Sequence, residues 1–135
     1  RSLATAIAPM KYIMTEAEFD ELSSAGTEEQ KKMFEAYWKK RDTSPSTAFN
    51  EMMEEFYKRV DHATGSYGTL KDPNGMRSDR GKVHILYGPP NRVERKLIPS
   101  SAPQEIWYYV RLKKKVVFVD PSKAGDYKLQ SLDAL

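Results

Sequence analysis

The spacing of apolar residues changes partway along the chain, and this change restricts the folds that the chain can adopt. Up to residue 60, apolar and aromatic residues recur every three or four positions, as they do in amphipathic helices. These residues are Met33, Phe34, Tyr37, Trp38, Phe49, Met52, Met53, Phe56, Tyr57 and Val60. From residue 83 onwards, apolar residues fall in short alternating runs, as they do in strands. We therefore predict an α+β fold, with about three N-terminal helices packed on a C-terminal antiparallel sheet of four or five strands.

Short motifs mark the ends of these elements. Thr15–Glu18 has the spacing of a helix capping box, and Ser44–Pro45 predicts the start of the third helix. The strands are predicted over residues 83–87, 92–98, 105–110, 115–120 and 127–132. Alternation places Trp107 and Tyr109 on one face of their strand. We expect that face to pack in the core and not to serve as a stacking platform for bases.

The chain has the length of one domain. We expect residues 1–135 to form a single domain, with a helical half over residues 1–65 and a sheet half over residues 66–135. Because the chain begins at Arg1 and not at a methionine, we expect it to have been cut from a longer protein. No apolar run approaches the roughly 18 residues of a membrane span, so no transmembrane segment is predicted.

The residue types present exclude several kinds of site. The chain has no cysteine and two histidines, which excludes disulfides, cysteine nucleophiles and thiolate or histidine-rich metal sites. No catalytic or nucleotide-binding signature is present, and we expect no cofactor. The Gly88–Pro90 segment is not a phosphate loop, because proline has no amide to donate. We expect Pro89 and Pro90 to form a rigid turn that ends the first strand and presents a binding loop with Asn91 and Arg92.

The charge is distributed unevenly along the chain. Residues 1–63 carry 9 Lys and Arg against 12 Asp and Glu, whereas residues 64–135 carry 13 against 7. One interpretation is that the basic half binds nucleic acid or another polyanion. The residues for that alternative are Arg92, Arg95, Lys96, Arg111, Lys113, Lys114 and Lys115. The interpretation that we favour is that acidic helices neutralise basic strands within the protein.

Two pairs of charged residues lie where predicted elements meet. Arg41 and Asp42 end an aromatic-rich helix, and Asp79 and Arg80 precede the predicted first strand. These four residues could form a junction that binds an anion or a peptide, because arginine offers paired donors. The interpretation that we favour is that they form internal salt bridges and helix caps. A third alternative is a hydrolase-like enzyme, with Asp79 as acid or base and Arg80 stabilising an anion.

Residues 75–90 carry a resemblance to a known family. The segment GMRSDRGKV, followed by Ile85, Tyr87 and Gly88-Pro89-Pro90, is similar to the signature of the GWxTD-domain family of bacterial proteins. Met76 stands where the naming motif has tryptophan, and Ser78 stands where it has threonine. The methionine keeps the bulk of the tryptophan, and the serine keeps a hydroxyl that can cap a turn.

The resemblance covers most of the chain and implies a location and a class of function. Further residues that match the family pattern are Tyr12, Ile13, Thr15, Phe34, Trp38, Arg41, Asp42, Asn50, Glu105–Tyr109, Phe118–Asp120 and Gly125–Tyr127. Members are typically exported proteins, and no catalytic activity is attached to the family. We therefore expect a non-enzymatic interaction or scaffold module of the periplasm or cell envelope. Its partner would be another protein, or another part of its own parent chain, bound through a sheet edge or the helix–sheet junction.

Overall fold

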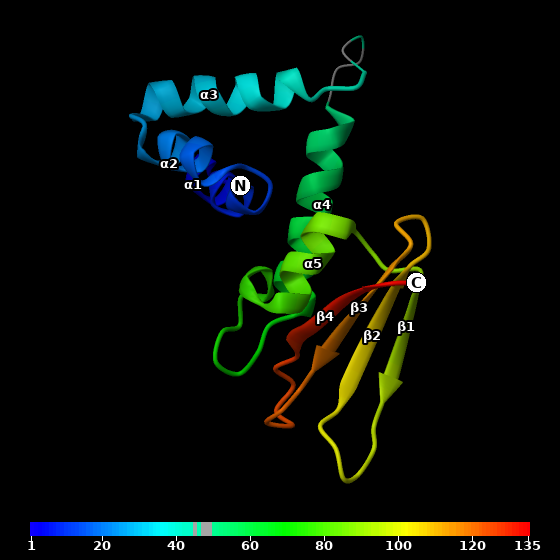
Figure 1. The fold of residues 1–135 in the computed structure, drawn as a ribbon. Helices are drawn as coiled ribbons and strands as arrows, with labels where there is room; N and C mark the ends of the chain where they lie inside the picture. The colour runs from blue at the N-terminus through cyan, green and yellow to red at the C-terminus, as the bar shows by residue number, and fades with distance from the viewer. Residues whose placement is uncertain (45, 47–49) are drawn as a thin grey trace. The chain divides into compact units, whose positions relative to one another are not determined.

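The computed structural model describes residues 1–44, 46 and 50–135, and it has an α+β fold. Helices occupy the N-terminal part, and an antiparallel sheet occupies the C-terminal part, as predicted (Figure 1). The chain divides into two compact units, Arg1–Lys58 and Arg59–Leu135. The boundary lies inside helix α4 (Glu51–Ser66), so this helix contributes residues to both units.

The first unit is helical. Its elements are α1 (Leu3–Ile7), a 3-10 turn (Ala8–Tyr12), α2 (Glu16–Ser24), α3 (Thr27–Lys40) and the first half of α4. The predicted capping box is confirmed, because the Thr15 side chain accepts from the Glu18 amide while Glu18 accepts from the Thr15 amide. Trp38 is buried, with its ring centroid 5.4 Å from that of Phe56. The apolar stripe of α3 therefore faces the core of this unit.

Helix α4 begins later than the sequence predicts. Ser44 is not helical, and Pro45 and Phe49 lie outside the described residues. The helix begins at Glu51, and the Asn50 side chain acts as its cap by accepting from the Met53 amide at 3.0 Å. The other end of the same side chain donates to the Trp38 carbonyl.

The second unit holds the sheet and helix α5 (Asp79–Tyr87), which a short 3-10 turn (Gly75–Arg77) precedes. The strands are β1 (Arg92–Lys96), β2 (Gln104–Tyr109), β3 (Lys114–Val119) and β4 (Lys128–Ala134). They form an antiparallel meander in the order β1-β2-β3-β4, and an irregularity in register lies between Val117 and Phe118. Because the order follows the chain, β1 and β4 are the two edges of the sheet (Figure 1).

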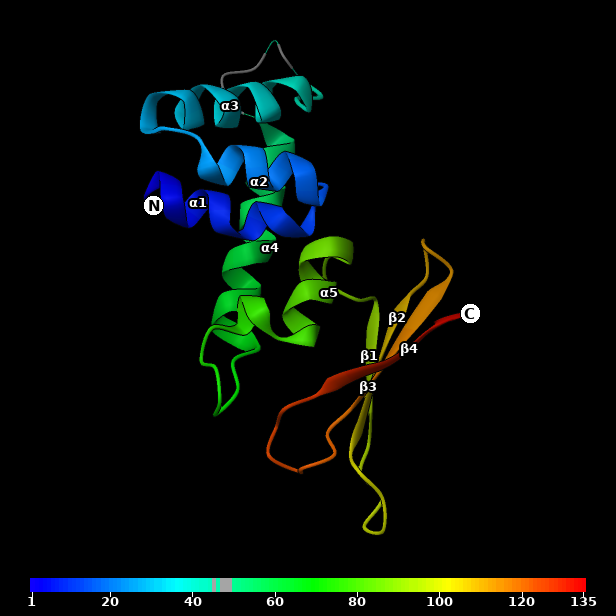
Figure 2. The same ribbon diagram turned by 60° about the vertical axis from the view of Figure 1, so that its left-hand side comes forward.

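Helix α5 shares a core with one face of this sheet, and Figure 2, in which the sheet is seen nearly edge-on, shows α5 on that side. Val83 of α5 packs with Trp107 and Tyr109 of β2 and with Val116 and Phe118 of β3. Partly buried tyrosines complete the cluster: Tyr67, Tyr87 and Tyr127. The prediction that the face bearing Trp107 packs in the core is confirmed, since Trp107 is only 1% exposed.

The predicted strand over residues 83–87 is wrong, because these residues form the second half of α5. Val83, His84 and Ile85 are consecutive and all buried, so this segment has no polar face. A short apolar run of this kind fits a buried helix as well as a strand. The helix ends at Gly88, which has a φ of +80° and whose amide donates to the His84 carbonyl at 2.7 Å. Pro89 and Pro90 therefore follow a helix, not a strand.

Candidate functional site

The signature segment, residues 75–81, forms the corner that begins α5. Ser78 is the N-cap residue, and its hydroxyl accepts from the Gly81 amide at 3.0 Å and donates to the Gly75 carbonyl at 2.8 Å. The two glycines allow the corner to close tightly. A Cβ at Gly81 would lie 1.8 Å from the Gly75 carbonyl oxygen, so no larger residue fits there. The prediction that the serine hydroxyl caps this segment is confirmed, although it caps a helix and does not lead into a strand.

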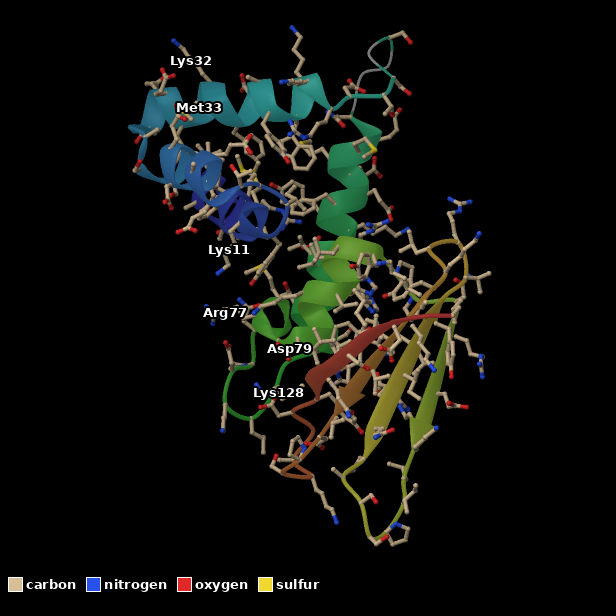
Figure 3. All side chains as sticks on the ribbon, in the orientation of Figure 1. Lys11, Lys32, Met33, Arg77, Asp79 and Lys128 are labelled. Carbon is tan, nitrogen blue, oxygen red and sulfur yellow. The ribbon has the colours of Figure 1, made fainter. Side chains whose placement is uncertain are left out.

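Asp79 connects this corner to the sheet. Its carboxylate accepts from the amide of Leu129, near the start of β4, at 2.7 Å. Figure 3 shows Asp79 at the beginning of α5 and Lys128 at the beginning of β4. The acidic residue also occupies the first turn of α5, where the helix dipole favours a negative charge. Asp79 thus holds the start of α5 against the edge of the sheet.

Arg80 lies next to Asp79 in sequence but contacts a different strand. Its guanidinium lies 3.4 Å from both carboxylate oxygens of Glu105 on β2. The same group lies over two tyrosine rings, 4.6 Å from the centroid of Tyr127 and 5.1 Å from that of Tyr67. The two neighbouring residues at the start of α5 therefore contact different strands: Asp79 contacts β4 and Arg80 contacts β2.

Glu105 is a buried carboxylate that receives several donors. It is 3% exposed and accepts from the Trp107 indole at 2.7 Å and from the Arg95 Nε at 3.2 Å, in addition to Arg80. Arg95 reaches it because β1 and β2 pair with Arg95 opposite Glu105. Burying a charge is costly unless it is paired and hydrogen-bonded, and here both conditions are met.

A pocket of about 460 Å³ opens beside this carboxylate. Its walls come from the loop after α4, from α5, and from β1 and β2; the lining residues are Ser66, Tyr67, Arg80, Val93, Arg95, Glu105 and Trp107. Burial raises the pKa of the Tyr67 hydroxyl, against the opposing effect of Arg80, so the phenol stays protonated at neutral pH. This pocket combines an aromatic wall with two guanidinium groups.

The predicted junction residues Arg41 and Asp42 belong to the first unit and have local partners. Arg41 follows α3, and its guanidinium lies 3.6 Å from the centroid of the Tyr37 ring and donates to the Tyr37 carbonyl. Asp42 accepts from the Ser44 amide at 2.9 Å. Asp79 and Arg80, in the second unit, have the contacts described above. The contacts of Arg41, Asp42, Asp79 and Arg80 are of the kind made by helix caps and by pairs of side chains within the protein.

The predicted loop, Pro89 to Arg92, connects α5 to β1. The Asn91 amide donates to the Tyr108 carbonyl and its side chain accepts from the Val110 amide, both at 2.8 Å. The Arg92 guanidinium lies 4.0 Å from the centroid of the Tyr108 ring. Asn91 and Arg92 therefore extend the pairing between β1 and β2.

The residues of the polyanion alternative lie at two ends of the sheet. Arg111 and Lys113 are in the turn after β2, and Lys114 and Lys115 begin β3. Arg95 and Lys96 pair with the opposite end of β2, at Glu105 and Gln104. At roughly 3.3 Å per residue, these two groups are separated by most of the length of a strand. The basic residues thus do not form one continuous row.

Sequence reasoning missed Glu105 and Tyr67 as site residues. Glu105 shares its strand face with Trp107 and Tyr109, so it is a charged residue at an inward position. That position was a usable signal, because buried carboxylates need cationic partners. Tyr67 gave no such signal, since it lies in an irregular polar segment. Among the described residues, no group of three or more metal-binding side chains occurs.

The family model described as the GWxTD domain matches residues 1–130. The chain belongs to the GWxTD domain family. No curated protein and no solved structure matches it. In this GWxTD domain, three positions of the naming motif are a close-packed glycine, a helix cap and a strand anchor, occupied by Gly75, Ser78 and Asp79. No helix in the described part of this GWxTD domain is long and apolar enough to cross a membrane.

The cap position yields a first prediction for this GWxTD domain. We expect Ser78→Ala to lower the free energy of unfolding by about 1 kcal/mol, because the Gly81 amide loses its acceptor. We expect Ser78→Thr, which restores the residue of the family motif, to change it by less than about 0.5 kcal/mol. Urea denaturation of the two variants measures the difference. A threonine variant as unstable as the alanine variant would show that the hydrogen bond from the Gly81 amide to the residue-78 hydroxyl does not account for the stabilisation.

Proposed function

We propose that this GWxTD domain is a non-enzymatic interaction module of an exported or envelope-associated bacterial protein. It binds another protein, or another part of its parent chain, by adding a strand at the edge formed by β4. The observation that carries the proposal is the exposure of that edge strand. Six of the seven residues of β4 are exposed, and the remaining one, Ser131, is half-buried.

The backbone of β4 is suited to pairing with an extended segment. The Leu135 amide donates to the Lys113 carbonyl, across the sheet, so the amides of Asp133 and Leu135 face β3. By alternation, the amides of Leu132 and Ala134 face the free edge. Asp79 covers only the start of this edge, through the Leu129 amide. An added strand would therefore find open backbone groups over the second half of β4.

The side chains of the two edge strands favour β4 over β1. β1 has the sequence RVERK, in which four of five residues are charged, and charged residues on an edge discourage pairing. β4 has the sequence KLQSLDA, and its Leu129 and Leu132 are 48% and 44% exposed. Exposed leucines on an open edge offer apolar contacts to the side chains of an incoming strand.

A capture experiment tests this proposal. The whole chain serves as bait for the envelope fraction of the source cell at low and at high salt, and mass spectrometry identifies what binds. The partner is then purified and its affinity is measured against two variants, Leu132→Lys and Leu97→Lys. Leu132 is 44% exposed on β4. Leu97 directly follows β1, is 71% exposed and does not line the pocket beside Glu105, so the same substitution there is the control at the other edge of the sheet.

We expect a partner that survives high salt, at least about tenfold weaker binding with Leu132→Lys, and a change of less than about twofold with Leu97→Lys. Equal losses in both variants would contradict binding at β4. Capture of nucleic acid alone, lost as salt rises, would instead support the polyanion alternative.

A further inference from the structure

The charged groups that line the pocket between α5 and β1–β2 are mostly cationic. Among the described lining residues Glu105 is the only carboxylate, and its oxygens already have partners: Oε1 accepts from Trp107 and Arg80, and Oε2 accepts from Arg80 and Arg95. A carboxylate offers about four acceptor positions, so Glu105 has little acceptor capacity left for a ligand. The charged groups still able to bind a ligand are therefore the two arginines, beside the neutral hydroxyls of Ser66 and Tyr67.

Arg95 provides the most accessible of these donors. Its side chain is 66% exposed, and within the described chain it donates to Glu105 through Nε, which leaves both Nη groups for a ligand. Arg80 is 14% exposed, and its guanidinium lies over the rings of Tyr67 and Tyr127. One guanidinium is thus largely buried, and the other is exposed beside the pocket.

The charge of the pocket selects the charge of its ligand. Two guanidinium groups face one carboxylate, which leaves a single positive charge. A monoanion neutralises that charge, whereas a phosphate near its dianionic form would bring an uncompensated negative charge beside the buried Glu105. A planar carboxylate also matches the paired donors of arginine.

The walls of the pocket select the rest of the ligand. The rings of Tyr67 and Trp107 have centroids 5.4 Å apart and planes inclined by 49°, and Val93 adds an apolar side chain. A volume of about 460 Å³ lies within the usual range for small-molecule sites. Trp107 is only 1% exposed, so the ring that a ligand can reach is that of the half-buried Tyr67. A flat apolar group would contact this ring and Val93 while its charge meets Arg95.

We propose that this pocket binds a monocarboxylate that carries a flat apolar group. Arg95 pairs with the ligand carboxylate, the less exposed Arg80 adds a second positive charge beside it, and Tyr67 and Val93 contact the apolar group. The pocket lies beside β1, at the edge of the sheet opposite β4, so it is a second site that does not depend on the proposed strand addition. Either proposal can fail alone.

Two arginines of β1 provide a matched pair of variants. Arg92 and Arg95 are on the same strand with side chains 62% and 66% exposed, but Arg92 contacts Tyr108 and Glu94 and does not line the pocket. Arg95→Gln and Arg92→Gln remove the same charge, so any general electrostatic effect is equal in both. The probes are benzoate, its neutral analogue benzamide, and inorganic phosphate, each titrated into the whole chain at constant ionic strength.

Binding is followed by the NMR signal of the Trp107 indole, which is distinguished from that of Trp38 by a Trp38→Phe variant. We expect benzoate to shift the Trp107 signal, benzamide and phosphate to bind at least about tenfold more weakly, and Arg95→Gln to weaken benzoate binding by at least about tenfold. We expect Arg92→Gln to change it by less than about twofold. Benzamide binding as tightly as benzoate, phosphate binding more tightly, or equal losses in both variants would overturn the proposal.

The carboxylate could belong to a free acid or to the C-terminus of a peptide. A short peptide that ends in phenylalanine distinguishes these sources when it is compared with the same peptide amidated at its C-terminus. Binding of the free-carboxyl peptide, abolished by amidation, identifies a peptide terminus as the ligand. Binding of benzoate without binding of either peptide identifies a small acid. Absence of binding by benzoate and by both peptides overturns the proposed site.

Discussion

Gly75→Ala is expected to destabilise the second unit by at least about 3 kcal/mol. Gly75 is buried, and a Cβ at this position would lie 2.1 Å from the Ala63 carbonyl oxygen and 2.7 Å from the Gly68 amide nitrogen. Both atoms are backbone atoms, so no side-chain rotation relieves the overlap. The corner must instead move away from α4, which would disturb the Ser78 cap and the position of α5.

Gly65→Ala is the matched control for this prediction. Gly65 lies near the end of α4, and a Cβ there would meet no atom within 4 Å. We expect this variant to leave stability unchanged or to raise it by up to about 1 kcal/mol, because alanine favours helix more than glycine does. Urea denaturation followed by the Trp107 indole signal measures both variants in the second unit. A Gly75→Ala variant within about 1 kcal/mol of the parent would show that the corner is not closely packed in solution.

The sequence was informative where an element has one buried face. The helix stripes predicted Trp38 in α3 and Phe56 and Val60 in α4 as buried, because periodicity records which side of an element is buried. In the same α4 stripe, however, Met52 is 49% exposed. Alternation correctly placed Trp107 and Tyr109 in the core, although Ile106 on the other face of β2 is buried as well.

Periodicity failed at residues 83–87, where burial on several sides of α5 removes the polar face that would have shown a period near 3.6. The hydroxyl cap at Ser78 was predicted, and it was in fact the better signal that a helix begins there.

The pocket could not have been predicted as a unit, although several of its residues were noted separately. Arg95 and Glu105 meet only because the turn between β1 and β2 sets a register that pairs them. Arg80 meets Glu105 only because Asp79 anchors the start of α5 on β4. Such contacts depend on how the elements are placed in three dimensions, and the spacing of residues along one sequence does not reveal that placement. Arg80 and Arg95 were assigned to separate hypotheses for this reason.

Glu105→Ala is expected to lower the free energy of unfolding by about 3 kcal/mol, because it removes one partner of a buried charged network. Two guanidinium groups would then lie close together without a carboxylate, and the buried Trp107 indole would lose its acceptor. In the variant, the exposed Arg95 side chain can rotate into solvent, which reduces the repulsion between the two guanidinium groups. Arg80 is only 14% exposed and lies over the Tyr127 ring, so its guanidinium would stay buried without a carboxylate partner.

Glu94→Ala is the matched control, because Glu94 is on the neighbouring strand and opposite Ile106, next to Glu105. Its carboxylate accepts from the Tyr108 hydroxyl at 3.1 Å and lies 3.9 Å from Arg92, with 37% of the side chain exposed. Exposed pairs contribute at most about 1 kcal/mol, so we expect a loss no larger than that. Urea denaturation followed at Trp107 compares the two variants. Equal losses of stability would mean that Glu105 is paired no more strongly than a surface carboxylate. Glu105 would then not be the group that holds Arg80 and Arg95 beside the pocket.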